Sequence, residues 1–367
     1  LWMVGLDSYT KAQEWNKQWG GKIGKDDPLV YGRDWEVIDN KKYLYRNFDP
    51  YEYMVREWAP TQSHNLTVNG KSGKTTFNIG LGLLDQSGMN KNAKEDNFNR
   101  YNASVRLSTE FNKHITLRAG AIYSKRVKRY ANVSTSTSAD IWYYLYRWGS
   151  YTPLGMNEDG AMLRSPVSES AQANTAEISD NYTNINIGAT INITDNWKVD
   201  VDYTHANNEK IENKPGIRYT AADTWSGATL VKDENGNQVY VDGAGNVVSA
   251  GTQGAIPKYA LKTYEYTSTG SSSTDYMYRR HYNTERNTLN ITTNYDWQIN
   301  DDHNLKVLLG LNRVTYDSEY HWAKITQLLD LSNPNFDLTG GTQTSSGGIA
   351  WEGQFGYFGR LNYNFKE

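Results

Sequence analysis

Residues 184–193 read NINIGATINI, and this stretch decides the fold. Ile185, Ile187, Ala189, Ile191 and Ile193 alternate with Asn, Gly and Thr. Because successive side chains of a β-strand point to opposite faces, the stretch predicts a strand with one apolar and one polar wall. Strands of soluble sheets usually have about 5–6 residues, whereas a strand that crosses a bilayer needs about 9–11. The stretch has the length of a strand that crosses a bilayer.

The same alternation recurs in eight further segments. They are residues 65–69, 76–83, 101–108, 115–123, 197–204, 288–297, 305–312 and 357–365. Together the segments predict an all-β fold, an antiparallel up-and-down transmembrane β-barrel segment of about nine strands. We expect the apolar phase to face lipid and the polar phase to face the barrel lumen. The polar phase includes Arg106, Arg118, Asp200, Asp202, Asn290, Asp296 and Arg360.

The connections between these segments alternate in length. Short polar connections occupy residues 69–74, 110–114, 194–197 and 299–304, and longer ones occupy 84–98, 125–182, 206–282 and 313–353. Short periplasmic turns and long extracellular loops are typical of outer-membrane barrels. Within one long loop, DENGN (233–237) and DGAGN (242–246) predict tight turns, because Gly and Asn tolerate positive φ.

Aromatic residues cluster at the ends of the predicted strands, where interfacial girdles would lie. They are Tyr101, Tyr123, Tyr182, Trp197, Tyr203, Trp297, Tyr357 and Phe365. The composition agrees, because 28 Tyr and 12 Trp stand against 8 Phe, a bias toward rings with a polar end. A secreted glycan-binding protein could show the same bias.

Composition also excludes several classes of protein. A hydrophobic fraction of 38% and a mean hydropathy of -0.75 are too polar for a helical membrane protein. The absence of cysteine excludes disulfides, thiol nucleophiles and thiolate metal sites. A net charge of -3 does not indicate a nucleic-acid partner.

The first 61 residues show no sustained period, and we interpret them as an extracellular loop region with short helices near 8–19 and 50–58. Residues 62–367 would form the partial barrel, without a plug domain. The opening LWMVGLDSYT lacks the pattern of a signal peptide, and the closing NYNFKE falls within a strand pattern. We therefore expect a fragment of a longer or processed protein.

No catalytic or metal-binding constellation emerges, so the sequence predicts neither an enzyme nor a cofactor. The six histidines are scattered. Asp233 begins a calcium-loop pattern, but Gln238 stands where the sharp-turn glycine belongs. Asp200 and Asp202 share a strand face with Lys198, which favours a solvated lumen wall over acid–base chemistry.

One loop segment, residues 140–154 (DIWYYLYRWGSYTPL), is a candidate for substrate binding. Its candidate residues are Trp142, Tyr143, Tyr144, Tyr146, Arg147, Trp148 and Tyr151. Two interpretations stay open: a loop that packs its rings against the barrel, or a stacking surface for a sugar or peptide. Trp322 and Trp351 are weaker candidates of the same kind.

Several stretches resemble the early barrel of SusC/RagA-type TonB-dependent outer-membrane transporters. They are TQSHNLTVNG (61–70), KTTFNIGLGLLDQSGMN (74–90), RYNASVRLSTEFNKHITL (100–117) and GYFGRLNYNF (356–365). The resemblance implies a plugged barrel of about 22 strands. It also implies a SusD-like lipoprotein partner, energy from TonB–ExbB–ExbD through an N-terminal region, and import of oligosaccharides or, in some members, peptides.

About nine strands and no plug depart from that pattern, so we expect an incomplete barrel that does not transport unaided. The expected function is glycan import across the cell outer membrane, as part of such a transporter. Two rivals stay open. One is a secreted all-β carbohydrate-binding protein, and the other is a gated porin without energy coupling.

Overall fold

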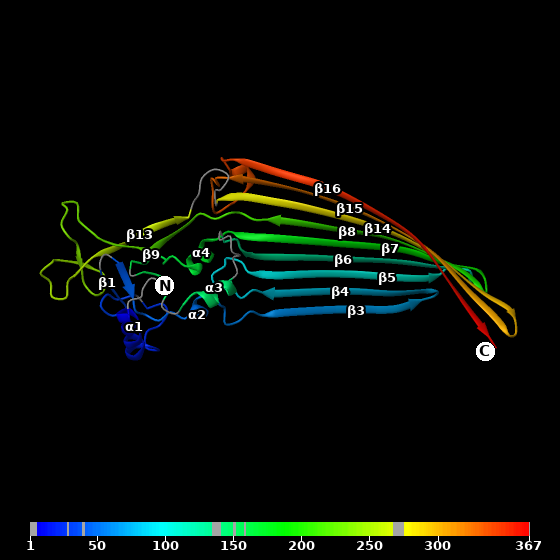
Figure 1. The fold of residues 1–367 in the computed structure, drawn as a ribbon, viewed down its shortest axis with the longest axis horizontal. Helices are drawn as coiled ribbons and strands as arrows, with labels where there is room; N and C mark the ends of the chain where they lie inside the picture. The colour runs from blue at the N-terminus through cyan, green and yellow to red at the C-terminus, as the bar shows by residue number, and fades with distance from the viewer. Residues whose placement is uncertain are drawn as a thin grey trace.

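The structure, a computed structural model, describes residues 6–27, 29–38, 41–133, 141–149, 152–157, 159–266 and 275–366. Nine strands form one antiparallel sheet, in the order in which they follow along the chain (Figure 1). They are β3 (Thr61–Ser72), β4 (Thr75–Ser87), β5 (Asn97–Glu110), β6 (Ile115–Ala131), β7 (Thr175–Thr194), β8 (Trp197–Asn213), β14 (Tyr276–Asn300), β15 (His303–Thr326) and β16 (Gln343–Phe365). Each of the nine segments predicted from alternation lies in one of these strands, so the up-and-down fold is confirmed.

The connections divide between the two ends of the sheet, as the sequence predicts. All four short turns lie at the end that holds the C-terminus, and all four long connections lie at the other end (Figure 1). In the turn between β3 and β4, Gly73 adopts a φ of +58°, which suits a tight two-residue hairpin.

The predicted loop bounds are wrong, because the strands continue far into the predicted loops. β14 and β15 have 25 and 24 residues, and they pair from Tyr276↔Thr326 to Asn300↔His303. The extension around residues 276–286 (YMYRRHYNTER) lacks apolar alternation. Outside a bilayer neither face has to be apolar, so backbone pairing alone maintains the strands there, and alternation does not reveal them.

Smaller elements form a layer at the long-loop end of the sheet (Figure 1). They are α1 (Leu6–Trp19), β1 (Trp35–Ile38), β2 (Lys41–Leu44), α2 (Pro50–Met54), α3 (Ile141–Arg147), α4 (Pro166–Gln172), β9 (Tyr219–Leu230), β10 (Tyr240–Val241), β11 (Val247–Val248), β12 (Ile256–Pro257), β13 (Tyr259–Tyr266) and a 3-10 turn (Phe336–Leu338). The two predicted helices near 8–19 and 50–58 correspond to α1 and α2. Local signals start α2 and α4: Asp49 and Ser165 cap the helices, and a proline follows each.

This layer has its own hydrophobic core, made from three separate parts of the chain. Trp35, Leu44, Phe48 and Met54 pack with residues that follow β6, including Leu154 and Leu163, and with Ala222 of β9. The N-terminal segment and two of the long connections therefore form one packed unit rather than independent loops. The described helices include none that is both long and apolar enough to cross a membrane.

The two tight turns predicted at residues 233–237 and 242–246 are confirmed. Gly236 and Gly245 have φ values of +84° and +87°. Asp233 accepts hydrogen bonds from the amides of Asn235 (2.9 Å) and Asn237 (2.8 Å). Asp242 does the same in the hairpin of β10 and β11. The hydrogen bonds from Asn237 hold the pKa of Asp233 below its usual value.

Candidate functional site

The outward phase of the nine-stranded sheet forms a continuous exposed apolar band. Leu66 on β3, Ile187 on β7 and Leu309 on β15 expose 58%, 61% and 56% of their surface. Soluble monomers rarely leave a contiguous apolar patch larger than a few hundred Å². The band therefore matches the lipid-facing surface of an outer-membrane barrel. The girdle prediction is wrong for Tyr182. This residue lies in register with Ser124 and Asn208, on the inner phase with Gly188.

The position of the band also reveals that the strands are tilted. One row of the pairing register runs from Phe77 on β4 through Ile187 on β7 to Leu289 on β14. Phe77 lies next to the short-turn end of its strand, whereas Leu289 lies 11 residues before Asn300. Rows of paired residues therefore climb through the band from strand to strand, as they do in the tilted strands of a barrel.

The inner phase carries an ion-pair network on β6, β7 and β8. Arg118 lies 3.0 Å from Asp202 and 3.6 Å from Asp200, and Thr190 bonds both Arg118 and Asp200. Gly188 lies between Arg118 and Asp202 in the register. A Cβ atom there would come within 2.2 Å of the Asp202 carboxylate and 3.2 Å of the Arg118 guanidinium, so any larger residue would displace this ion pair.

The remaining predicted lumen residues also lie on the inner phase. Asn290 accepts from Asn312 (2.6 Å), and Asp296 pairs with Lys306 (3.1 Å). Arg106 faces Gly120 of β6 and, with Arg118, lines a hollow of about 810 Å³. Arg360 lies opposite Leu308. Within the described ranges, no three His, Cys, Asp or Glu side chains gather as a metal site. The polar face is therefore a wall on which Arg118 and Lys306 have carboxylate partners.

The first half of the aromatic segment forms α3, and its described side chains divide between two environments. Trp148 and Leu145 pack against the hydrophobic core of the outer layer. Tyr146 is 74% exposed, its ring lies edge-on to that of Tyr143 at 5.9 Å, and the Arg147 guanidinium lies 4.5 Å from the Tyr143 ring. The structure therefore brings Tyr143, Tyr146 and Arg147 together. The side chains of Trp142 and Tyr144, and all of Tyr151, lie outside the described residues.

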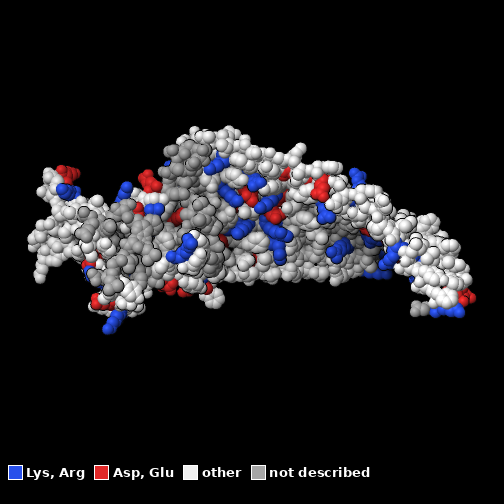
Figure 2. All heavy atoms as spheres, in the orientation of Figure 1, with Lys and Arg blue, Asp and Glu red and all other residues white. Residues whose placement is uncertain are grey.

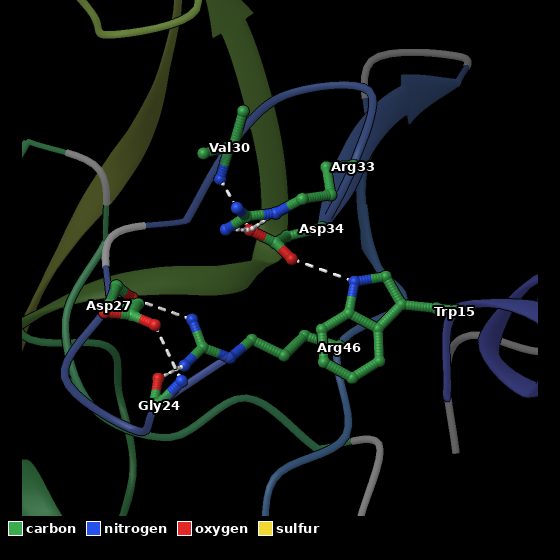
Figure 3. Close-up of polar contacts among 7 residues, drawn as sticks. All are labelled: Trp15, Gly24, Asp27, Val30, Arg33, Asp34 and Arg46. Carbon is green, nitrogen blue, oxygen red and sulfur yellow. Dashed lines mark hydrogen bonds and ion pairs between the residues drawn. The ribbon is translucent and has the colours of Figure 1, made fainter. Parts of the chain in front are cut away.

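A buried polar cluster ties α1 to the rest of the outer layer (Figure 3). Asp34 is fully buried and accepts hydrogen bonds from the Trp15 indole (2.9 Å), the Val30 amide (2.8 Å) and the Arg33 guanidinium (2.6 Å). Arg46 is 3% exposed and donates to the carbonyl of Asp27 at 2.7 Å. Because each buried group has partners, the cluster fixes the layer rather than forming an open site.

Four further cations lie on the inner phase and are not among the site residues that the sequence predicts. They are Arg100, Arg126, Lys128 and Arg280, which we call the basic strip. Figure 2 shows Lys and Arg side chains gathered over the middle of the face it presents, with fewer Asp and Glu. Arg100 and Arg126 are direct cross-strand partners. Alternation along each strand assigns these residues to the polar phase. Which of them become neighbours depends on the register between strands, which alternation within one sequence does not predict.

A tilted up-and-down sheet with an apolar outer band and a polar inner face has the fold of part of a large outer-membrane β-barrel. Three structures of the RagAB importer share this fold. The RagAB peptide importer aligns in its "closed-closed" state with a TM-score of 0.55 at 14% identity, and in its "open-open" state with 0.58 at 13%. The RagAB peptide transporter aligns with 0.54 at 14%.

Each alignment covers 98% of this chain but only 34–35% of the other chain. The chain thus spans about a third of the length of those proteins. No protein-family model matches the sequence, and no curated protein matches it either. At 13–14% identity the likeness establishes the fold alone.

Proposed function

We propose that the chain forms part of the barrel of a TonB-dependent importer in the cell outer membrane. One observation carries the proposal: a single nine-stranded sheet combines a continuous exposed apolar band with a concave polar face. Such a sheet is stable where hydrocarbon covers the band, and the polar face then lines a water-filled path. A secreted carbohydrate-binding protein would leave this band in water, which argues against the soluble rival.

We further propose that the solute is an oligosaccharide, with a peptide as the second class. At the long-loop end, Tyr146 is exposed beside Tyr143 and Arg147, and rings in this arrangement can stack on a sugar while the guanidinium donates hydrogen bonds. RagAB is described as a peptide importer, which keeps the peptide class in the proposal. The candidates Trp142, Tyr144 and Tyr151 belong to the same proposal, whereas Trp148 packs against the core of the outer layer and supports the stacking surface.

The partners in this proposal follow from the resemblance to SusC/RagA-type transporters. A SusD-like lipoprotein would cover the long-loop end, where the outer layer forms a packed platform. TonB with ExbB and ExbD would supply energy through an N-terminal region of the complete protein. Domain roles follow in the same way: residues 1–61 lie outside the membrane, and residues 62–367 contribute the barrel wall.

The test is uptake by cells that carry the complete transporter. Labelled oligosaccharides and peptides of graded size are supplied to three strains: one with the transporter, one without it, and one without TonB. We expect to recover the transporter in the membrane fraction, and we expect uptake to be lost in both deletion strains. Uptake that persists without TonB would identify a gated porin, and recovery of the protein in the soluble fraction would favour the secreted rival.

A further inference from the structure

The basic strip lies just beyond the apolar band, on the inner face of the sheet. Arg100 is next to Tyr101, the last aromatic residue of the band on β5, and Arg126 follows Tyr123 by three residues on β6. Arg280 lies on the extension of β14 toward the long-loop end. The strip therefore borders the external mouth of the lumen, which a solute meets before the hollow lined by Arg106 and Arg118.

The charges of the strip are poorly compensated. Arg100 and Arg126 lie directly opposite each other, an arrangement of like charges that destabilises a sheet. Asp180 is in register with Arg126, yet in the described part of the chain no salt bridge joins these side chains. Arg118, which lies deeper in the lumen wall, is by contrast compensated by two carboxylates within 3.6 Å.

Glu212 is the cross-strand partner of Arg280 in the register, but among the described residues no salt bridge joins the two side chains. Its carboxylate pairs with Lys210 at 2.6 Å and with Lys214 at 2.8 Å. Among the described residues, the buried Nε atoms of Arg100 and Arg280 have no hydrogen-bond partner. A guanidinium presents Nε and Nη donors as a fork that fits one carboxylate in bidentate fashion. Both Nε atoms are buried, but each belongs to a guanidinium, the group best suited to bind a carboxylate.

Aromatic rings lie beside these cations. The Arg280 guanidinium lies 4.1 Å from the ring centre of Tyr282 and 5.0 Å from that of Tyr320, and those two rings are 5.6 Å apart. Lys128 lies 5.2 Å from the Tyr130 ring. From β5 to β14 the strip crosses four strand spacings, about 19 Å. That length suits several units of an extended oligomer rather than a single small anion.

We propose that the basic strip binds the carboxylates of an acidic oligomer as it enters the barrel. The inference rests on the proposed import function and narrows its substrate class. The shared chemistry is a chain that carries several carboxylates, and both a uronic-acid oligosaccharide and an acidic peptide supply it.

The test measures equilibrium binding to the purified complete transporter in detergent, which needs no TonB. The acidic probes are hexagalacturonate and hexaglutamate, and their neutral counterparts are maltohexaose and a Gly-Ser hexapeptide. We expect at least one acidic probe to bind about tenfold or more tightly than its counterpart, with an affinity that falls as salt rises. The acidic probe that binds identifies the source of the carboxylates.

The variant Arg100→Gln/Arg126→Gln should weaken binding of the acidic probe by about tenfold or more and leave neutral probes unchanged. Lys125→Gln is the matched control, because Lys125 is adjacent to Arg126 on β6 but on the outward phase. It should bind like the parent. Arg100→Lys/Arg126→Lys keeps both charges and should retain most of the preference for acid.

Equal binding of acidic and neutral probes by the parent would overturn the inference, as would an undiminished preference in the Gln variant. If both the Gln and the Lys variants fail to assemble in the membrane, the arginines serve another part of the protein and the inference is wrong. Acid-selective binding combined with TonB-independent uptake would leave the inference intact and refute the proposed function instead.

Discussion

Replacing Ile187 by arginine tests which face of β7 meets lipid. The side chain is 61% exposed within the apolar band, between Ala119 and Tyr203 in the register. Arginine on the lipid face of a barrel costs about 2–4 kcal/mol near the midplane. That cost corresponds to a roughly 30- to 700-fold loss in the folding equilibrium.

The matched control is Asn186→Arg, the same substitution one residue away on the inner phase. Asn186 donates to Thr204 at 2.9 Å, so its loss costs about 0.5–1.5 kcal/mol. Arg106 lies two strands away, about 10 Å, where water and salt screen the repulsion. The new arginine should therefore be tolerated, as an additional lumen cation.

The assay is folding of the complete transporter into lipid vesicles, followed by urea titration, with outer-membrane yield in cells as a second readout. Ile187→Arg should unfold at clearly lower urea and accumulate poorly, and Leu107→Arg should behave in the same way. Equal stability of the position 186 and 187 variants would refute the assignment of the two faces.

Three further predictions concern particular contacts. Gly188→Ala should lower the free energy of unfolding in urea by about 1–3 kcal/mol, because the new Cβ would lie 2.2 Å from an Asp202 oxygen. In an Asp202→Ala background most of that loss should disappear, and an undiminished loss there would refute the steric explanation. Asp34→Ala should cost about 1–3 kcal/mol for each buried donor that it orphans, and a protease-resistance profile of the outer layer identical to the parent's would contradict this. The hydrogen bonds from Asn237 lower the pKa of Asp233 from 3.8, so they stabilise the turn in full above pH 3.8, and this stabilisation is lost as the pH falls through the lowered pKa. Hydrogen exchange of the Asn237 amide, corrected for its intrinsic rate, should therefore show protection that is lost only in that acid range. Protection that disappears near neutral pH would contradict this prediction.

The sequence predicts the strands where a bilayer imposes alternation and fails where it does not. Residues 184–193 alternate because hydrocarbon covers one face and water the other, and they lie in β7 as expected. The first ten residues of β14 show no such alternation, because polar and aromatic residues are mixed along them. Their strand structure comes from pairing with β8 and β15, information that lies elsewhere in the chain.

The site was predictable to a similar extent. Phase alone places Arg118, Asp200 and Asp202 on the inner face, and the structure joins them. The opposition of Arg100 and Arg126 depends on the offset between β5 and β6, which alternation does not encode. For residues 140–154, the aromatic content leaves both a packed loop and a stacking surface open, and only tertiary structure separates Trp148, which packs against the core, from Tyr146 at the surface.

The central claim, a sheet with lipid on one face and water on the other, can be tested along residues 184–193. These residues contain no cysteine, so single cysteines can be introduced there one at a time and spin-labelled in a transporter whose other cysteines, where present, are replaced by serine. In the complete transporter, reconstituted in lipid, the account predicts a period of two. Labels at 185, 187, 189, 191 and 193 should collide mainly with oxygen dissolved in the bilayer, and labels at the even positions mainly with a water-soluble nickel chelate. A uniform response to the chelate at all ten positions would contradict the account.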